Sequence, residues 1–151
     1  MLMPKKTKYR KVQKGRIKGL SKGCRNITFG DYGLYALESG RITARQIEAV
    51  RVTVSRRLKK VGEYFLRMFP SKPITKKPAE TRMGKGKGNP EYWVCVAKRG
   101  RILLEIKGVE KEDAKKILKS ASYKLPIKTK FIDKSDDLST VEILKGALND
   151  G

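Results

Sequence analysis

Histidine is absent from this chain, and cysteine and acidic residues are scarce. Without histidine, neither a Ser-His-Asp nor a Cys-His catalytic arrangement can form. The two cysteines, Cys24 and Cys95, stand far apart and lack the paired spacing of zinc ligands. We interpret Cys95, which lies within an apolar run, as a buried free thiol. We therefore expect no catalytic residue, no metal and no cofactor, and the sequence does not favour an enzyme.

Long hydrophobic runs are also missing. No stretch of about 18 apolar residues occurs, so we expect no membrane span. Residues 1–11 lack the apolar segment of a secretory signal, and two unpaired cysteines suit a reducing compartment. The hydrophobic fraction of 38% is low for a globular protein but too high for a fully disordered one. We predict a cytoplasmic protein with one modest core.

Positive charge is what the chain has in excess, with 37 Lys and Arg against 15 Asp and Glu and a formal net charge of +22. A folded body with this charge repels itself unless an anionic partner neutralises it, and nucleic acid is the obvious polyanion. The charge divides the chain into three parts: a basic arm at residues 1–25, a folded domain at residues 26–132 and an acidic C-terminal extension at residues 133–151.

The arm contains ten cations, no acid and few apolar side chains. In isolation such a segment is disordered, and a nuclear-localisation or general polyanion-binding patch is the simplest alternative. The length of the arm, its aromatic Tyr9 and its glycines favour threading along a nucleic-acid backbone. The cations are Lys5, Lys6, Lys8, Arg10, Lys11, Lys14, Arg16, Lys18, Lys22 and Arg25.

Apolar periodicity predicts two helices in the folded domain. The first spans residues 44–60, with Thr43 as N-cap and an apolar stripe that continues to Val61 before Gly62. The second spans residues 111–124, with acids at its start. We predict strands at 26–29, 32–38, 63–69 and 127–132, and a β-hairpin made of 92–97 and 102–106 around a basic turn at 98–101.

Six cations and a single acid, Glu48, lie on the first helix. This excess is too large for ordinary pairing between side chains one helical turn apart. A solvated face is the alternative. We expect part of the face to contact RNA, with Arg45, Arg51 and Arg56 as the contacting cations.

Residues 82–88 combine alternate glycines with cations. Glycines at this spacing make a poor helix but let a backbone lie close to a bulky partner. The G-x-G-x-G order, with no helix after it, does not favour a mononucleotide site. A flexible exposed hairpin is the alternative to an RNA-contacting loop. Because three prolines precede it, we predict one long loop over residues 70–89. The seven residues are Arg82, Met83, Gly84, Lys85, Gly86, Lys87 and Gly88.

Several sequence blocks resemble the bacterial ribosomal protein L-sixteen family. The likeness covers residues 1–132 in order, and the RMGKGKG block is the most specific part. The acidic extension continues beyond the family's usual end, and residues 24–27 lack an obvious match. The blocks are MLMPKKTKYR (1–10), GRITARQIEA (40–49), MFPSKPIT (68–75), KPAETRMGKGKG (77–88), EYWV (91–94) and KLPIKT (124–129).

The resemblance implies a structural constituent of the large ribosomal subunit with a compact α+β fold, an antiparallel sheet and two helices. It implies binding to large-subunit (23S-type) rRNA, contacts with neighbouring ribosomal proteins and a part in subunit assembly. The arm from Lys5 to Arg16 would thread rRNA. The loop 82–88 would point towards the peptidyl-transferase region and aminoacyl-site tRNA, with the peptidyl site as an alternative. An organellar ribosome is the alternative to a bacterial one.

Two other classes of protein share some of these features. An RNA-modifying or RNA-cleaving enzyme would also need a basic track, but the absence of histidine and of acids in an apolar setting disfavours it. A chromatin-type DNA-binding protein is the other alternative. Cations scattered over an arm, a helix and loops, with no helix-turn-helix or zipper pattern, suit irregular RNA better.

Overall fold

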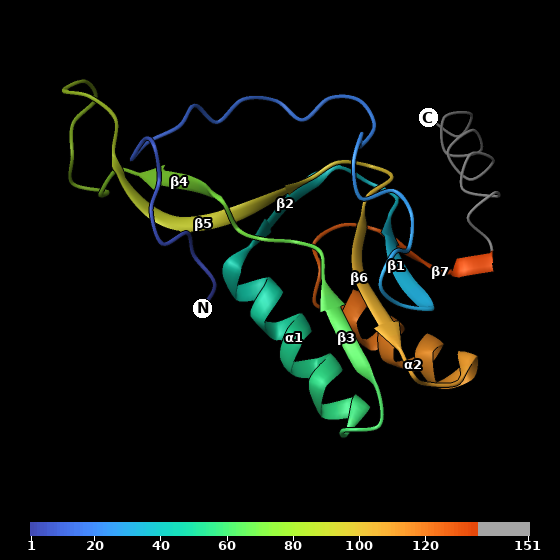
Figure 1. Cartoon of the computed structure of the whole chain (residues 1–151). Helices are drawn as coiled ribbons and strands as arrows, with labels where there is room; N and C mark the ends of the chain where they lie inside the picture. Colours follow the sequence, from blue (N-terminus) through green and yellow to red (C-terminus); the bar gives the residue numbers. More distant parts are fainter. Residues whose placement is uncertain (136–151) are drawn as a thin grey trace.

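Two apolar stripes at helical spacing form the two helices of the computed structural model, which describes residues 1–135 (Figure 1). Helix α1 spans Ala44–Leu58 and begins as predicted, because Thr43 and Gln46 form a capping box. The Thr43 hydroxyl accepts from the Gln46 amide at 3.2 Å, and the Gln46 side chain accepts from the Thr43 amide at 2.9 Å. Helix α2 spans Lys111–Ser122 and buries an apolar stripe made of Ala114, Ile117, Leu118 and Ala121.

The end of α1 differs from the prediction. The helix stops at Leu58, and Lys59 and Lys60 turn the chain with positive φ values of 47° and 68°. Val61 is 75% exposed, so its assignment to the apolar stripe was wrong. The helical repeat no longer holds once the backbone enters the left-handed region, and Val61 is therefore rotated away from the core.

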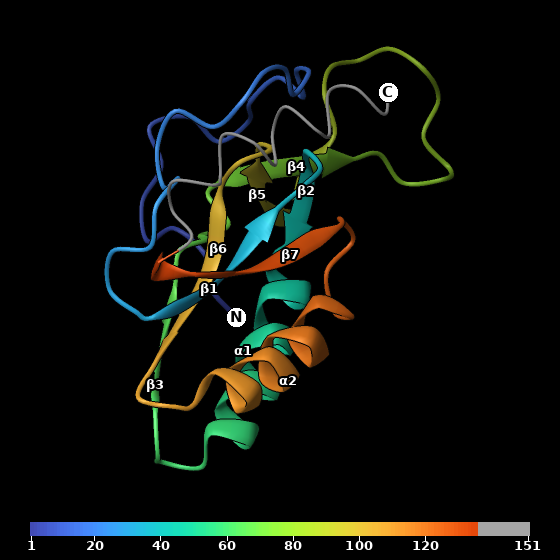
Figure 2. The same ribbon diagram turned by 90° about the vertical axis from the view of Figure 1, so that its right-hand side faces the viewer.

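A four-stranded antiparallel sheet carries most of the core. Its order is β3-β6-β1-β7, and the helices cover one face, where Leu34, Leu104 and Ile106 pack against them (Figure 2). On the other face, Ile27 packs with Tyr35, Ile102 and Ile132. The strands are β1 (Tyr32–Ala36), β3 (Glu63–Leu66), β6 (Ile102–Lys107) and β7 (Thr129–Asp133).

A second antiparallel sheet has three strands in the order β2-β5-β4. They are β2 (Gly40–Thr43), β4 (Lys72–Lys76) and β5 (Asn89–Ala97). The prediction of a single loop over residues 70–89 was therefore wrong. Because β4 is an edge strand, it accommodates Pro73, which has no amide hydrogen to donate and pairs with Trp93.

The predicted hairpin between residues 92–97 and 102–106 was also wrong. Strands β5 and β6 are consecutive in the chain, but β5 pairs with β2 and β4, whereas β6 pairs with β1 and β3. Both edges of each strand are thus already occupied. The basic segment 98–101 crosses from one sheet to the other, and Gly100 at φ 90° donates to the Ala36 carbonyl.

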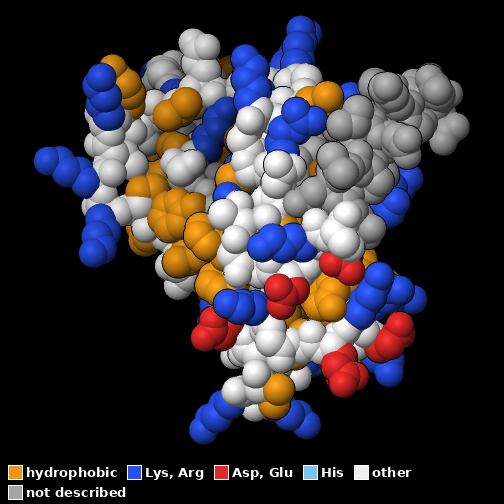
Figure 3. Space-filling view, turned by 45° about the vertical axis from the view of Figure 1, so that its right-hand side comes forward, with side chains coloured by type: hydrophobic (Ala, Val, Ile, Leu, Met, Phe, Trp, Pro, Cys, Tyr) orange, Lys and Arg blue, Asp and Glu red, His pale blue; other side chains and the backbone are white. Residues whose placement is uncertain are grey.

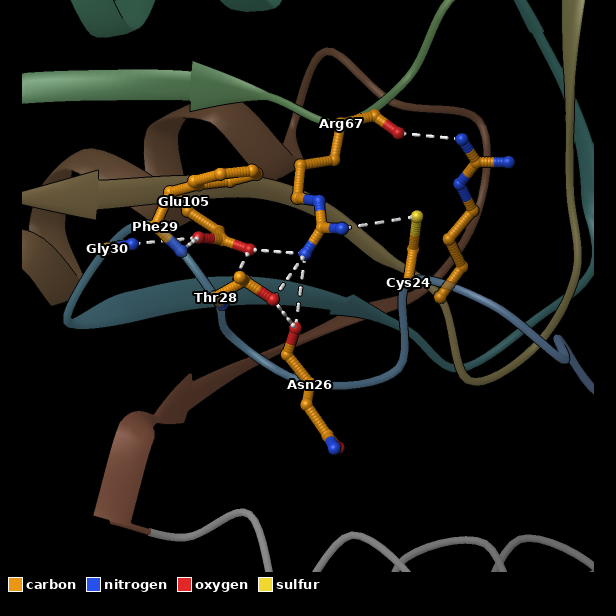
Figure 4. A network of polar contacts seen from close by, with 8 residues as sticks. Cys24, Asn26, Thr28, Phe29, Gly30, Arg67 and Glu105 are labelled. Atoms are coloured by element: carbon orange, nitrogen blue, oxygen red, sulfur yellow. Dashed lines mark hydrogen bonds and ion pairs between the residues drawn. The ribbon is translucent and has the colours of Figure 1, made fainter.

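Residues 26–29 do not form the predicted strand, and the amides of Thr28 and Phe29 bind a buried carboxylate instead. Glu105 on β6 is fully buried and accepts from the amides of Thr28 (3.2 Å), Phe29 (2.7 Å) and Gly30 (2.8 Å) (Figure 4). Arg67 completes the network with a 2.8 Å ion pair to Glu105.

The network keeps Glu105 ionised inside the protein. Burial alone would raise its pKa, but the bonds from Arg67 and from the three amides outweigh burial and lower the pKa. Arg67 also donates to the Cys24 sulfur at 3.4 Å, and its own carbonyl accepts from Arg101 at 2.7 Å (Figure 4). The network therefore joins Cys24, near the C-terminal end of the arm, to strand β6.

The strands predicted at 32–38, 63–69 and 127–132 are confirmed in shorter form as β1, β3 and β7. Cys95 is a buried free thiol, as predicted. Residues 136–151, which include most of the acidic extension, lie outside the described residues. Within the described part, no helix has the length and apolar character to cross a membrane.

Candidate nucleic-acid interface

The basic arm lies along the three-stranded sheet, and cations of that sheet hold its backbone (Figure 1). Arg41 on β2 donates to the carbonyls of Lys14 at 3.2 Å and Gly15 at 3.0 Å. Lys72 on β4 also donates to the Lys14 carbonyl. Further along, the Ser21 amide donates to the Arg99 carbonyl at 2.8 Å. The sheet therefore fixes the path of the arm without using any acidic side chain.

The arm also contacts the glycine loop directly. The Lys11 ammonium donates to the Lys87 carbonyl at 2.9 Å, and the Lys87 ammonium donates to the Val12 carbonyl at 2.7 Å. Two segments that are far apart in the sequence thus hold each other through a reciprocal pair of bonds. Because both acceptors are neutral carbonyls, the two positive charges remain available to an anionic partner.

The glycines of the loop have two different roles. Gly84, Lys85 and Gly86 are consecutive residues with positive φ values of 93°, 62° and 93°, which fold the tip back on itself. Gly88 lies against the end of β4, where an added Cβ would come within 2.7 Å of the Lys76 carbonyl group. The tip itself is exposed, and Met83 is 96% accessible.

Cations crowd together where the arm, the sheet and the loop meet. The pKa of Lys72 is lowered, first by partial burial and then by the charges of Arg41 and Lys87. No residue from 1 to 30 is acidic. On the face in Figure 3, the acidic side chains gather over the lower half, whereas the charged side chains of the upper half are Lys and Arg. An anion would relieve the repulsion between these cations.

The structure places the predicted site residues in three groups. The arm and loop residues share the surface just described, which we call the arm–loop surface: residues 5–16, residues 82–88, Arg41 and Lys72. Arg45 is exposed at the start of α1 and Arg56 near its C-terminal end. Arg51 instead binds Glu48 on its own helix, with Nε 3.0 Å from the carboxylate, and this bond raises its pKa.

Sequence reasoning missed Arg41 and Lys72, which hold the arm. Each is an isolated cation on a short strand, and no local pattern distinguishes it from a solvated residue. It also missed Glu105, for which a signal exists, since a lone acid inside the apolar run of residues 102–106 has to find a partner.

Comparison with known proteins decides the family. The sequence profile described as Ribosomal protein L16p/L10e matches residues 4–132. This chain belongs to that family. It is 54% identical over 136 residues to the "Large ribosomal subunit protein uL16" of Heliobacterium modesticaldum, covering 90% of this chain and 94% of the relative. A protein of the same description from Leptospira biflexa is 53% identical over 135 residues, with 89% and 98% covered.

Membership confirms the resemblance found in the sequence blocks, and the two helices with antiparallel sheets confirm the α+β fold that it implied. Members of this ribosomal protein family are structural constituents and not enzymes, so the family also settles the choice against an RNA-modifying or RNA-cleaving enzyme. The match ends at residue 132, which coincides with the start of the acidic extension.

Proposed function

We propose that this chain is a structural constituent of the large subunit of a bacterial-type ribosome. In that role it binds 23S-type rRNA and neighbouring ribosomal proteins, and it supports subunit assembly. The observation that carries the proposal is the reciprocal contact of Lys11 with Lys87, which joins the arm and the glycine loop into one surface. Family membership and the names of the two relatives support the ribosomal setting.

The arm is proposed to bind rRNA phosphates. The side chains of Lys5, Lys6, Lys8 and Arg10 are exposed and make no hydrogen bond or ion pair within the described part of the chain. A phosphate contact releases counterions, so the logarithm of the affinity falls with the logarithm of the salt concentration in proportion to the number of contacts. Four contacts correspond to a slope of about 3 units.

Replacement of these four residues by alanine tests the arm. Binding of the purified protein to full-length large-subunit rRNA is measured over a range of salt concentrations, and the slope is expected to become shallower by about 3 units. The matched control removes four exposed cations of the folded domain, at Lys107, Lys116, Lys119 and Lys130. If the two variants behave alike, only total charge matters and the arm has no specific role.

The tip of the loop is proposed to contact aminoacyl-site tRNA near the peptidyl-transferase region. Arg82 and Lys85 are exposed there, and their side chains make no hydrogen bond or ion pair among the described residues, whereas Lys87 also holds the arm. Replacement of Arg82 and Lys85 by alanine therefore removes the proposed tRNA contacts while Lys87 still holds the arm in place. We expect normal incorporation into subunits but weaker aminoacyl-site tRNA binding, by up to about 1 kcal/mol for each exposed contact.

The control for the loop is the pair Lys107→Ala and Lys130→Ala in the same subunits. Filter binding of aminoacyl-tRNA and the rate of peptide synthesis are both measured. If the loop variant incorporates, binds tRNA and elongates like the control, the tRNA contact is excluded while the rRNA role stands. Weakened peptidyl-site binding alone would move the contact to the neighbouring site.

A further inference from the structure

A groove lies between the C-terminal halves of the two helices, away from the arm–loop surface. Its volume is about 460 Å³. Figure 1 shows the end of α1 at the opposite end of the molecule from the β4–β5 loop. The groove is lined by Thr53, Arg56 and Arg57 of α1 and by Ser120, Tyr123 and Lys124 at the end of α2.

The donors that the groove offers to a ligand are cationic. The Thr53 hydroxyl donates to the Ala49 carbonyl at 2.8 Å and the Ser120 hydroxyl to the Lys116 carbonyl at 3.1 Å, so both hydrogens are used within the helices. The side chains of Arg56, Arg57 and Lys124 have no hydrogen bond or ion pair with any residue from 1 to 135. Three positive charges therefore face a space that holds no acid among its lining residues.

The simplest explanation is that these cations only complement the dipoles of the two helices, whose C-terminal ends carry partial negative charge. Tyr123 is not explained in this way. Its side chain is 74% exposed, beside the cations and outside both hydrophobic clusters. An exposed aromatic ring next to arginines is the combination on which unpaired bases stack while their phosphates are bound.

We propose that the groove is a second RNA site, in which Arg56, Arg57 and Lys124 bind phosphates and the Tyr123 ring stacks on an unpaired base. The inference rests on the proposed function and extends it, since the arm–loop surface and the groove lie at opposite ends of the molecule. The chain would then connect two separate segments of rRNA. An acidic protein segment would meet the cations but would leave the aromatic ring without a partner.

Two sets of variants test the phosphate and the base contacts. Replacement of Arg56, Arg57 and Lys124 by alanine should weaken binding to full-length large-subunit rRNA more than the control Lys107→Ala, Lys130→Ala, Lys134→Ala, which removes the same charge from the sheet side. Tyr123→Leu should weaken binding about ten-fold, whereas Tyr123→Phe keeps the ring and should bind like the wild type. Equal binding by the groove and control variants, or by Tyr123→Leu and Tyr123→Phe, overturns the proposal.

The assembled subunit identifies the occupant. A photoreactive benzoylphenylalanine in place of Tyr123 should yield an adduct that nuclease digestion shortens. An adduct that resists nuclease and is digested only by protease overturns the proposal in favour of a protein neighbour. The absence of any adduct overturns it in favour of solvent. Failure of the groove proposal is distinguishable from failure of the proposed function. If only the groove proposal fails, the wild-type protein still binds rRNA and the arm variant binds it more weakly. If the proposed function fails, the wild-type protein does not bind rRNA.

Discussion

The two ends of the molecule are held together by different forces. In the four-stranded sheet and its helices, side chains such as Leu104, Ile106 and Leu118 are fully buried, and the one buried acid has its own arginine. On the arm–loop surface, lysine and arginine side chains bind neutral carbonyls, and their charges repel one another. The first region is held by its own apolar core and by a buried ion pair. The arm–loop surface has excess positive charge, and the negative charge that neutralises it has to come from a partner.

Arg67→Ala should have the largest effect, because it leaves the Glu105 carboxylate buried without its cation. Breaking a buried pair on one side typically costs about 3–5 kcal/mol of folding free energy. Urea denaturation of the free protein at neutral pH measures the loss. Arg51→Ala is the control, since its pair with Glu48 is substantially exposed, and we expect it to cost about 1 kcal/mol or less. Similar losses for both variants would contradict the importance of burial.

Acid should weaken the same network, with a somewhat smaller effect. The pKa of Glu105 in the folded protein lies below its usual value, so the ionised form stabilises the fold at pH values above that usual value. This contribution is lost as the pH falls below the usual carboxyl value and through the lowered pKa. We expect a loss of about 2 kcal/mol, as for a charged hydrogen-bonded group. Glu105→Gln, measured over the same range, should lack this part of the acid sensitivity.

Gly88→Ala tests the base of the glycine loop, where the loop meets the end of β4. An added Cβ would overlap the Lys76 carbonyl group, so the β4–β5 end has to shift at a cost of about 1–3 kcal/mol. Gly84→Ala meets no atom within 4 Å and has only the positive φ to oppose it, at about 1 kcal/mol. Thermal unfolding of both variants ranks them. A larger loss for Gly84→Ala would show that the loop tip, rather than its base, is the constrained part.

Lys87→Met should have the smallest effect on stability. The residue is exposed and its bond to the Val12 carbonyl is at the surface, so we expect a change within about 0.5 kcal/mol in urea denaturation. Amide exchange near Val12 should nevertheless become faster, because the arm loses its contact with the loop. Unchanged exchange would show that Arg41 and Lys72 hold the arm without the loop.

The sequence was sufficient where structure depends on neighbours along the chain. The start of α1 at Thr43 follows from local hydrogen bonding, and the stripe of α2 follows from helical periodicity. The partner of β5 could not be predicted, because strand pairing is decided between distant segments: Ile42 and Ile74 flank β5, and Tyr32 and Tyr64 flank β6.

The candidate site shows the same division. Composition predicts a basic surface, and the RMGKGKG block predicts that residues 82–88 form a loop of that surface. The meeting of Lys11 with Lys87 depends on where the sheet carries each segment, and no spacing in the sequence contains that information. The roles of Arg41, Lys72 and Glu105 likewise arise only from contacts between segments far apart in the chain.

The separation of β5 from β6 has a consequence for the order of events during synthesis. The arm and all three strands of the small sheet lie within the first 97 residues, so they leave the ribosome's exit tunnel before β6 and β7 do. The four-stranded sheet stays incomplete until β7, which ends at residue 133, has emerged. Because chains fold from the N-terminus as they are made, the charged half of this protein can form before its main core is closed.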